Sequence, residues 1–265
     1  MKYNKTMENH KKQEIEYYDR KAIELQNISD ENKKTDFEGL NHSLFTSYKF
    51  CEKWLKENSN GKKLLDYGCG NGVHSTLPAK NNAQVLAVDL SKESLKLAQK
   101  KAEQEKVSDK VKFKVMDCEK LDLPNNSFDI VFDGGTFSSL ELEKGISEIA
   151  RVLKPEGAML AIETLGHNPI ANLKRAINKL RGKRTGWATN HIFKTQDLDL
   201  LKKYFNKIDV KYFHLSFILA LPFRNYSFIK YPVKILDAID YLLLKIPFLK
   251  KYAFKIVVIA SNPKK

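Results

Sequence analysis

The sequence Leu64-Leu65-Asp66-Tyr67-Gly68-Cys69-Gly70-Asn71-Gly72 joins a short apolar run to an acid and a glycine-rich turn. A second apolar run follows and ends at Ala87-Val88-Asp89-Leu90, again in an acid. In a parallel sheet, two such runs place a ligand at the carboxyl ends of neighbouring strands. The glycines let the backbone approach that ligand, and Asp89 can accept hydrogen bonds from both ribose hydroxyls. The pattern therefore predicts a doubly wound α/β fold that binds a nucleoside.

The spacing of the glycines distinguishes between nucleoside cofactors. A dinucleotide-binding turn follows the pattern Gly-x-Gly-x-x-Gly, and its third glycine packs a helix beside a pyrophosphate. Here Val73 occupies that third position, and Asp66 stands two residues before the first glycine. A carboxylate there repels a pyrophosphate but attracts a ligand with a cationic amino acid group. The arrangement resembles motif I and the following acidic position of class I S-adenosylmethionine (SAM)-dependent methyltransferases.

Further motifs extend this resemblance in the expected order. Residues 110–116 are expected to form a third strand that ends at Asp117-Cys118. In the family, the carboxylate of such a pair binds the exocyclic amine of adenine, and the next residue supplies a backbone contact. Residues 121–135 are similar to the segment that enters the fourth strand, and residues 151–157 to the phrase R-V-L-K-P-x-G before a fifth strand at 158–162. The close resemblance spans residues 61–163.

The resemblance implies both a fold and a cofactor. The expected fold is a mostly parallel, seven-stranded sheet whose last strand is antiparallel. The expected cofactor is SAM, with S-adenosyl-L-homocysteine (SAH) as its product. The residues expected to bind it are Asp66, Gly68, Cys69, Gly70, Asn71, Gly72, Asp89, Leu90, Asp117, Cys118, Asp133 and Tyr18.

Two additions to this core are expected, one at each end of the chain. Residues 1–60 are interpreted as an N-terminal helical cap, 61–214 as the SAM-binding core, 215–252 as a helical insert and 253–265 as the last strand and tail. Within the cap, residues 14–22 resemble an entry segment that closes over the methyl donor in small-molecule methyltransferases. Tyr17 and Tyr18 would place a ring or hydroxyl near the sulfonium, where a cation–π contact is favourable. The alternative is a surface helix with two packed tyrosines.

Candidates for proton transfer follow the fifth strand, at the rim where doubly wound sheets bind ligands. His167 is the first candidate for a general base, because an unperturbed imidazole titrates near neutrality. His191 is the second candidate, and Glu163 would orient a histidine or bind an acceptor hydroxyl. The alternative for either histidine is an ordinary loop or helix-cap residue.

Composition narrows the class of protein. Among 265 residues there are three cysteines without a C-x-x-C pair, so neither a disulfide framework nor a metal site is expected. The start of the chain is polar rather than signal-like, and no apolar run is long enough to span a bilayer. A cytoplasmic location is therefore predicted.

The net charge of +14 requires an explanation. The excess lies mostly in the C-terminal part, which also holds the apolar insert. Nucleic acid and an anionic membrane surface both favour clustered lysine and arginine, whereas a lysine-rich, solvated surface needs no partner. Ile235, Ile239, Leu242 and Ile246 recur at helical spacing with basic residues beside them. The insert therefore fits a lid, a packing or dimer interface, or an element on the inner membrane surface.

The missing motifs argue against nucleic acid as the acceptor. Asp133-Gly134-Gly135-Thr136 stands where adenine-N6 methyltransferases carry a D-P-P-Y type tetrapeptide, and there is no Pro-Cys pair for cytosine-C5 chemistry. The chain is accordingly predicted to be a SAM-dependent methyltransferase acting on an oxygen or nitrogen of a small-molecule or lipid-like acceptor. The alternatives are an RNA methyltransferase that uses the basic C-terminal half and a non-catalytic SAM-binding subunit. The oligomeric state is left open.

Overall fold

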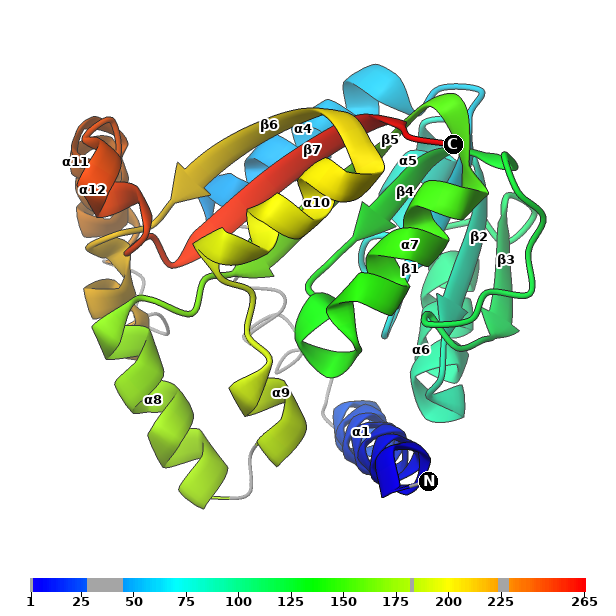
Figure 1. Cartoon of the computed structure of the whole chain (residues 1–265), viewed down its shortest axis with the longest axis horizontal. Coiled ribbons are helices and arrows are strands. Elements are labelled where there is room, and N and C mark those ends of the chain that lie inside the picture. The colour runs from blue at the N-terminus through cyan, green and yellow to red at the C-terminus, as the bar shows by residue number, and fades with distance from the viewer. Residues whose placement is uncertain (1, 28–44, 182–183, 224–228) are drawn as a thin grey trace.

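A single seven-stranded sheet forms the centre of the molecule (Figure 1). The computed structural model describes residues 2–27, 45–181, 184–223 and 229–265. The strand order is β3-β2-β1-β4-β5-β7-β6. Neighbouring strands are parallel except for β7, which is antiparallel to both β5 and β6. The strands are β1 (Lys63–Tyr67), β2 (Gln84–Asp89), β3 (Val111–Val115), β4 (Phe128–Asp133), β5 (Leu153–Thr164), β6 (Phe205–Phe213) and β7 (Lys255–Pro263). The predicted doubly wound, mostly parallel sheet is confirmed.

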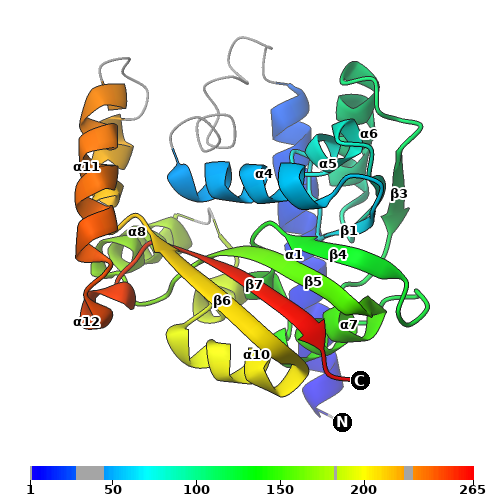
Figure 2. The ribbon, with the colours of Figure 1, turned by 90° about the horizontal axis from the view of Figure 1, so that it is seen from above.

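Helices cover both faces of the sheet, as Figure 2 shows from above. One face is covered by α4 (Thr46–Asn58), α5 (Thr76–Lys80) and α6 (Lys92–Gln104), and the other by α7 (Leu142–Val152) and α10 (Leu198–Tyr204). Leu64 and Leu65, adjacent in β1, belong to the two different apolar clusters. Because successive side chains of a strand point to opposite faces, a strand covered on both sides is apolar at consecutive positions. The central strands β1 and β4 have this character.

The N-terminal helix α1 (Lys2–Gln26) packs on α6 across the ligand edge of the sheet. Helix α6 begins with an N-cap serine, since the hydroxyl of Ser91 accepts a hydrogen bond from the backbone N–H of Ser94. Residues 1–60, predicted as a helical cap, contain α1 and α4, and residues 28–44 lie outside the described part of the chain.

The sequence-based boundaries need three corrections. The fifth strand is longer than the predicted 158–162, because β5 also includes residues 153–157, where its pairing with β4 shifts register between Phe128 and Ile130. Two helices were not expected, namely α8 (Pro169–Leu180) and α9 (Gly186–Asn190). Within the segment 253–265, predicted as the last strand and tail, the strand begins at Lys255 and extends to Pro263.

The insert contains a 3-10 helix, η3 (Phe217–Phe223), and two α-helices, α11 (Lys230–Leu243) and α12 (Pro247–Lys250). Part of it belongs to the core, because Phe217 packs against Phe45 of the segment that enters α4, with ring centroids 4.6 Å apart. Asp240 of α11 accepts hydrogen bonds from the backbone N–H groups of Leu215, Ser216 and Phe217. The insert is thereby tied to the end of β6. In the described part of the chain, no helix is both long and apolar enough to cross a bilayer.

Candidate cofactor and acceptor site

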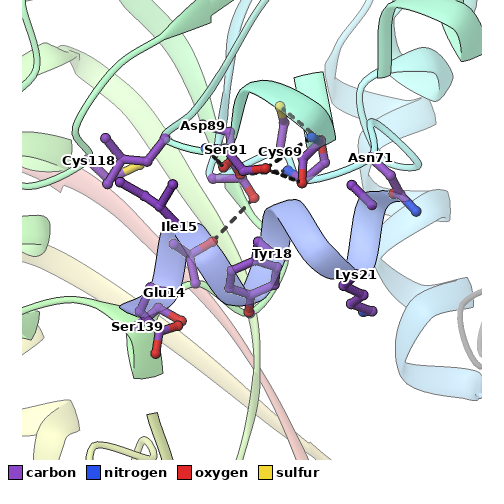
Figure 3. Close-up of a pocket in the computed structure, with 18 of the residues that line it drawn as sticks. Glu14, Ile15, Tyr18, Lys21, Cys69, Asn71, Asp89, Ser91, Cys118 and Ser139 are labelled. Atoms are coloured by element: carbon purple, nitrogen blue, oxygen red, sulfur yellow. Dashed lines mark hydrogen bonds between the residues drawn. The ribbon is translucent and has the colours of Figure 1, made fainter. Parts of the chain in front are cut away.

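A cavity of about 320 Å³ lies where the carboxyl ends of β1, β2 and β4 meet α1 (Figure 3). Its size falls within the range usual for small-molecule sites. The residues that follow the strands form its floor, and Ile15 and Tyr18 of α1 contribute to its wall. The site is therefore built from the edge of the sheet on which nucleoside ligands bind.

The glycine turn after β1 adopts a conformation that side chains disfavour. Gly68, Gly70 and Gly72 all have positive φ angles, of 66°, 52° and 75°. A Cβ atom at Gly68 would collide with the hydroxyl of Thr136, and one at Gly72 would lie 2.7 Å from the Cβ of Ala98. At Gly70 a Cβ atom would meet no atom within 4 Å. Two glycines thus allow close packing of the turn, and the backbone of the third lines the cavity.

Asp89 is held in place by the backbone around it. One carboxylate oxygen accepts a hydrogen bond from the N–H of Gly70 (2.9 Å) and the other from the N–H of Ser91 (2.8 Å). Burial raises the pKa of Asp89, and these two hydrogen bonds work in the opposite direction. The carboxylate reaches the cavity at the end of β2, where the sequence predicted ribose binding.

Asp66 lies deeper, at the end of β1, and is almost completely buried. Burial raises the pKa of its carboxyl group to about 7, although the hydroxyl of Ser75 donates a hydrogen bond to it. An opposite charge near a buried carboxylate favours its ionised form. Asp66 is therefore suited to interact with a cationic group of the ligand.

Asp117 also lines the cavity and is in contact with α1. The ammonium group of Lys11 lies 2.6 Å from a carboxylate oxygen of Asp117 and 2.8 Å from one of Glu119. The next residue, Cys118, is fixed from below because its carbonyl accepts a hydrogen bond from the hydroxyl of Tyr67 (2.6 Å). The predicted adenine end of the site is thus closed by a helix that precedes it in sequence by about a hundred residues.

The structure places nearly all the predicted cofactor residues around this one cavity. Those lining it are Tyr18, Asp66, Gly68, Cys69, Gly70, Asn71, Asp89, Leu90, Asp117 and Cys118. The exceptions are Gly72, which packs on α6, and Asp133. The buried carboxylate of Asp133 accepts hydrogen bonds from the N–H groups of Gly135 and Thr136, so it shapes the turn rather than the cavity surface. The individual roles of all twelve residues stay predictions.

The three predicted catalytic residues are not among the described residues that line the cavity. Glu163 is buried and accepts a hydrogen bond from the N–H of Phe137 (2.8 Å). Burial raises its pKa, and burial together with the charge of Glu163 raises the pKa of Asp133. The two carboxyl groups therefore favour a state in which at least one is protonated. The hydrogen bonds of Asp133 and Glu163 hold the turn after β4, and this structural role explains why both carboxyl groups are buried there.

The two predicted histidines lie in the region of α8 and α9. His167 Nε2 is 3.2 Å from the hydroxyl oxygen of Thr195, and burial and the charge of Lys194 lower its pKa. His191 is exposed, and its ring stacks on that of Trp187 with centroids 3.8 Å apart. Their roles as bases remain predictions that the arrangement of the cavity does not favour.

Sequence reasoning missed several other residues that line the cavity. His74 follows the glycine turn, and its ring lies parallel to that of Tyr48 from α4, with centroids 5.6 Å apart. Arg184 donates a hydrogen bond to the hydroxyl of Ser138 (2.9 Å) and lies 3.3 Å from the hydroxyl of Tyr18. A signal existed for both, since His74 stands two residues after the last glycine and Arg184 ends a basic run. The neighbouring sequence did not indicate that the side chains of His74 and Arg184 would face the cavity.

A doubly wound sheet with an acid-ended, glycine-rich site at β1 and β2 defines the class of Rossmann-like nucleoside-binding proteins. Residues 65–161 match the family model described as a methyltransferase domain. These residues form a methyltransferase domain of the class I SAM-dependent type, as the motifs predicted. The cavity suits that cofactor, because its three strand-end acids, Asp66, Asp89 and Asp117, accommodate a cation and a ribose but would repel a pyrophosphate.

Related proteins agree with this family. The chain is 39% identical over 107 residues to a sterol 24-C-methyltransferase of Gibberella zeae, covering 40% of this chain and 28% of that protein. It is 31% identical over 110 residues to a ubiquinone biosynthesis O-methyltransferase of Psychrobacter arcticus, covering 41% and 43%. The chain thus spans less than half the length of either relative.

The fold also has counterparts among solved structures. Geranyl diphosphate C-methyltransferase of Streptomyces coelicolor, solved with Mg²⁺, geranyl diphosphate and SAH, superposes with a TM-score of 0.57 at 15% identity. The superposition covers 81% of this chain and 79% of that one. At this level of identity the likeness concerns the fold alone.

Proposed function

We propose that this protein transfers a methyl group from SAM to an oxygen or nitrogen atom of a small-molecule or lipid-like acceptor. The observation that carries the proposal is the extent of the cavity. Beyond the predicted cofactor residues it continues to a second set of side chains contributed by other elements, including Tyr48, His74, Ser139 and Arg184. A site for the cofactor alone does not need this second set.

The residues that line the cavity and the functions of similar proteins both support an apolar acceptor. Ile15, Leu25 and Leu140 add apolar surface to the cavity, which accommodates hydrophobic parts of an acceptor. The similar proteins include a sterol methyltransferase and a ubiquinone biosynthesis methyltransferase. A lipid-like acceptor would reside at a bilayer, so the proposal includes peripheral contact with the inner membrane surface.

When bound, SAM supplies a methyl group made electrophilic by its sulfonium. The residues of the chain then have to orient the acceptor for in-line attack and remove a proton where the acceptor is a hydroxyl. Arg184 and Tyr18 offer hydrogen bonds that orient a polar group of the acceptor. His74 is the histidine that lines the cavity among the described residues, and it therefore fits the role of proton acceptor better than His167 or His191.

The decisive experiment uses purified protein, methyl-labelled SAM and an extract of the source cells. After the reaction, the label is partitioned between organic solvent, water-soluble small molecules and RNase-sensitive polymer. We expect label in the organic phase. Label confined to RNase-sensitive polymer would contradict a lipid-like acceptor and favour the RNA alternative. No transfer by a protein that binds SAH in calorimetry would favour the non-catalytic alternative.

Matched variants test the site in the same assay. Asp89→Asn should weaken SAH binding by roughly tenfold or more, because a charge-assisted contact is lost. Asp122→Asn is the control, since the side chain of Asp122 is 94% exposed on the loop before β4. His74→Gln should lower the transfer rate by about 10²-fold at unchanged SAH affinity if the acceptor needs a base. An equal rate for His74→Gln and wild type, with a loss in His167→Gln, would instead restore the sequence-based candidate.

A further inference from the structure

Helix α8 presents its apolar stripe to solvent. Ile170, Leu173, Ile177 and Leu180 recur at the spacing of one helical face and are exposed to between 40% and 89%. The side chain that α8 buries is the small Ala171. A surface helix normally turns such a stripe toward the core, so this orientation calls for another apolar partner.

The insert also presents an apolar helix face to solvent. In α11, the residues Tyr231, Ile235, Ile239 and Leu242 share one face and are exposed to between 44% and 76%. Phe248 of α12 is exposed as well. The inward side of α11 is occupied by Val233 and Asp240. The predicted helical spacing of the insert is therefore correct, but its apolar stripe faces away from the fold and lines no part of the cavity among the described residues.

The two stripes lie at the same end of the molecule. Both views place α8, α11 and α12 at the end opposite β3 (Figures 1 and 2). The helices are joined there, because the side-chain amide of Asn168, which caps α8, donates a hydrogen bond to the carbonyl of Tyr252 just after α12 (2.8 Å). We call the outward faces of α8, α11 and α12 the apolar end surface.

Charge on this surface has a single sign. The acids of the insert are turned inward, since Asp240 binds backbone N–H groups and Asp237 lies 3.1 Å from the buried His214. There is no acid in α8. In the described parts of α8 and the insert and at their ends, the exposed charged side chains are all basic, namely Lys174, Lys179, Arg181, Lys234, Lys245 and Lys251.

We infer that the apolar end surface docks the protein on an anionic lipid bilayer, with both apolar stripes inserted at the level of the headgroups. Exposed leucine, isoleucine and aromatic side chains beside lysines form the combination that interfacial helices use. A nucleic acid would match the charge but leave the apolar stripes in water. A second copy of the chain would cover the stripes but would bring basic rims together across a two-fold axis.

The surface is also connected to the cavity. Helix α8 ends at Leu180, and the chain then reaches Arg184, whose side chain lines the acceptor side of the cavity. A lipid-like acceptor could therefore pass from the bilayer along α8 to the site. This route rests on the proposed function, whereas docking on the bilayer does not.

Vesicle co-sedimentation tests the docking directly. We expect the full chain to bind phosphatidylcholine vesicles that contain phosphatidylglycerol and to bind pure phosphatidylcholine at least about tenfold more weakly, because the basic residues add to the apolar contribution. The combined variant Leu173→Ser, Leu180→Ser, Ile235→Ser and Leu242→Ser should bind anionic vesicles about tenfold or more weakly than wild type. Lys179→Gln with Lys234→Gln and Lys245→Gln should also weaken binding and reduce its dependence on salt.

The control variant is Val115→Ser on β3, a comparably exposed apolar residue at the far end of the molecule. It should bind vesicles like wild type. Calorimetry with SAH shows that each variant is folded, and it separates this inference from the proposed function. A protein that binds SAH but no anionic vesicles would overturn the docking, and with it the membrane contact in the proposed function, but would leave the proposed methyl transfer intact.

Three other outcomes would also overturn the inference. Vesicle binding that the four serine substitutions leave unchanged would assign the contact to another surface. A wild-type dimer in light scattering that becomes a monomer in the four-serine variant, without vesicle binding, would assign the apolar end surface to a second copy. Binding to RNA that the serine variant retains and the glutamine variant loses, again without vesicle binding, would assign the charge to nucleic acid.

Discussion

The protonation of single residues in this site depends on burial as much as on their chemical type. Asp66 and Asp89 are both strand-end aspartates of the cofactor motif. Asp89 receives two backbone hydrogen bonds, whereas Asp66 has the Ser75 hydroxyl and lies fully buried. The pKa of Asp66 therefore rises to about 7, and this carboxyl group is expected to lose its proton near neutral pH.

This shift predicts how stability depends on pH. The pKa of Asp66 is about 7 in the folded state and about 3.9 in an unfolded chain, so the folded state binds the extra proton between these values. Stability should therefore fall as the pH rises from about 4 to about 7, relative to Asp66→Asn, which cannot titrate. We expect the difference in unfolding free energy between wild type and Asp66→Asn to change by roughly 2–4 kcal/mol over that range and to level off above it.

Denaturant unfolding of wild type and variant at a series of pH values measures this difference. The exposed Asp122→Asn serves as reference and should show a nearly constant difference from wild type. A flat difference for Asp66→Asn as well would mean that the carboxyl group of Asp66 titrates normally in the folded protein.

Among the elements, α1 has the strongest influence on access to the site. It covers the cavity and is held over it by polar contacts at two places. Lys11 binds Asp117 and Glu119, and Asp19 accepts a hydrogen bond from the hydroxyl of Ser91 (2.6 Å). With α1 in this position, exchange of a ligand at the predicted adenine end requires these contacts to break. The helix is therefore a candidate for the step that limits exchange.

Weakening the contacts of α1 should speed exchange of the cofactor product. In Lys11→Gln with Asp19→Asn, we expect SAH to associate and dissociate about tenfold faster, since partly buried charged contacts contribute about 1 kcal/mol each. The equilibrium affinity should change less, because both rate constants rise together. Stopped-flow fluorescence or surface plasmon resonance measures the rates, and Lys12→Gln, on the exposed side of the same helix, is the control. Unchanged rates in the double variant would show that α1 does not limit exchange.

At the scale of the whole molecule, the integrity of the sheet depends on β7, the last strand in the sequence. β7 lies between β5 and β6 and pairs with both along most of its length. Without it, β6 has no neighbour in the sheet and the buried residues Ile256, Val257 and Val258 are missing from the core.

Ending the chain after Tyr252 should therefore abolish cooperative folding. We expect no cooperative thermal transition and no response to SAH, because a folded state that binds the ligand is required for stabilisation by mass action. Removing only residues 264–265 is the control. This shorter truncation removes a few hydrogen bonds, such as the one from Lys264 N–H to the carbonyl of Tyr204, and the protein should keep its cooperative thermal transition. A cooperative, SAH-responsive transition in the longer truncation would show that β7 is dispensable.

The sequence by itself determined the methyltransferase domain, the sheet and most of the residues predicted for the cofactor that line one cavity. These features are local, because a buried apolar strand, a glycine turn with positive φ angles and an acid at the strand end lie within a few residues of one another, as Asp66 and Gly70 do. The antiparallel direction of the last strand then followed from the family resemblance, and the pairing of β7 with β5 and β6 confirms it.

Only the tertiary structure decided what these elements face. It brought Lys11 to Asp117, placed His74 and Arg184 at the cavity, and buried Glu163 beside Asp133. It also turned the apolar stripes of α8 and α11 outward. Helical periodicity shows that a helix has an apolar face, but the direction of that face depends on contacts with residues far away in the chain, which no local pattern contains.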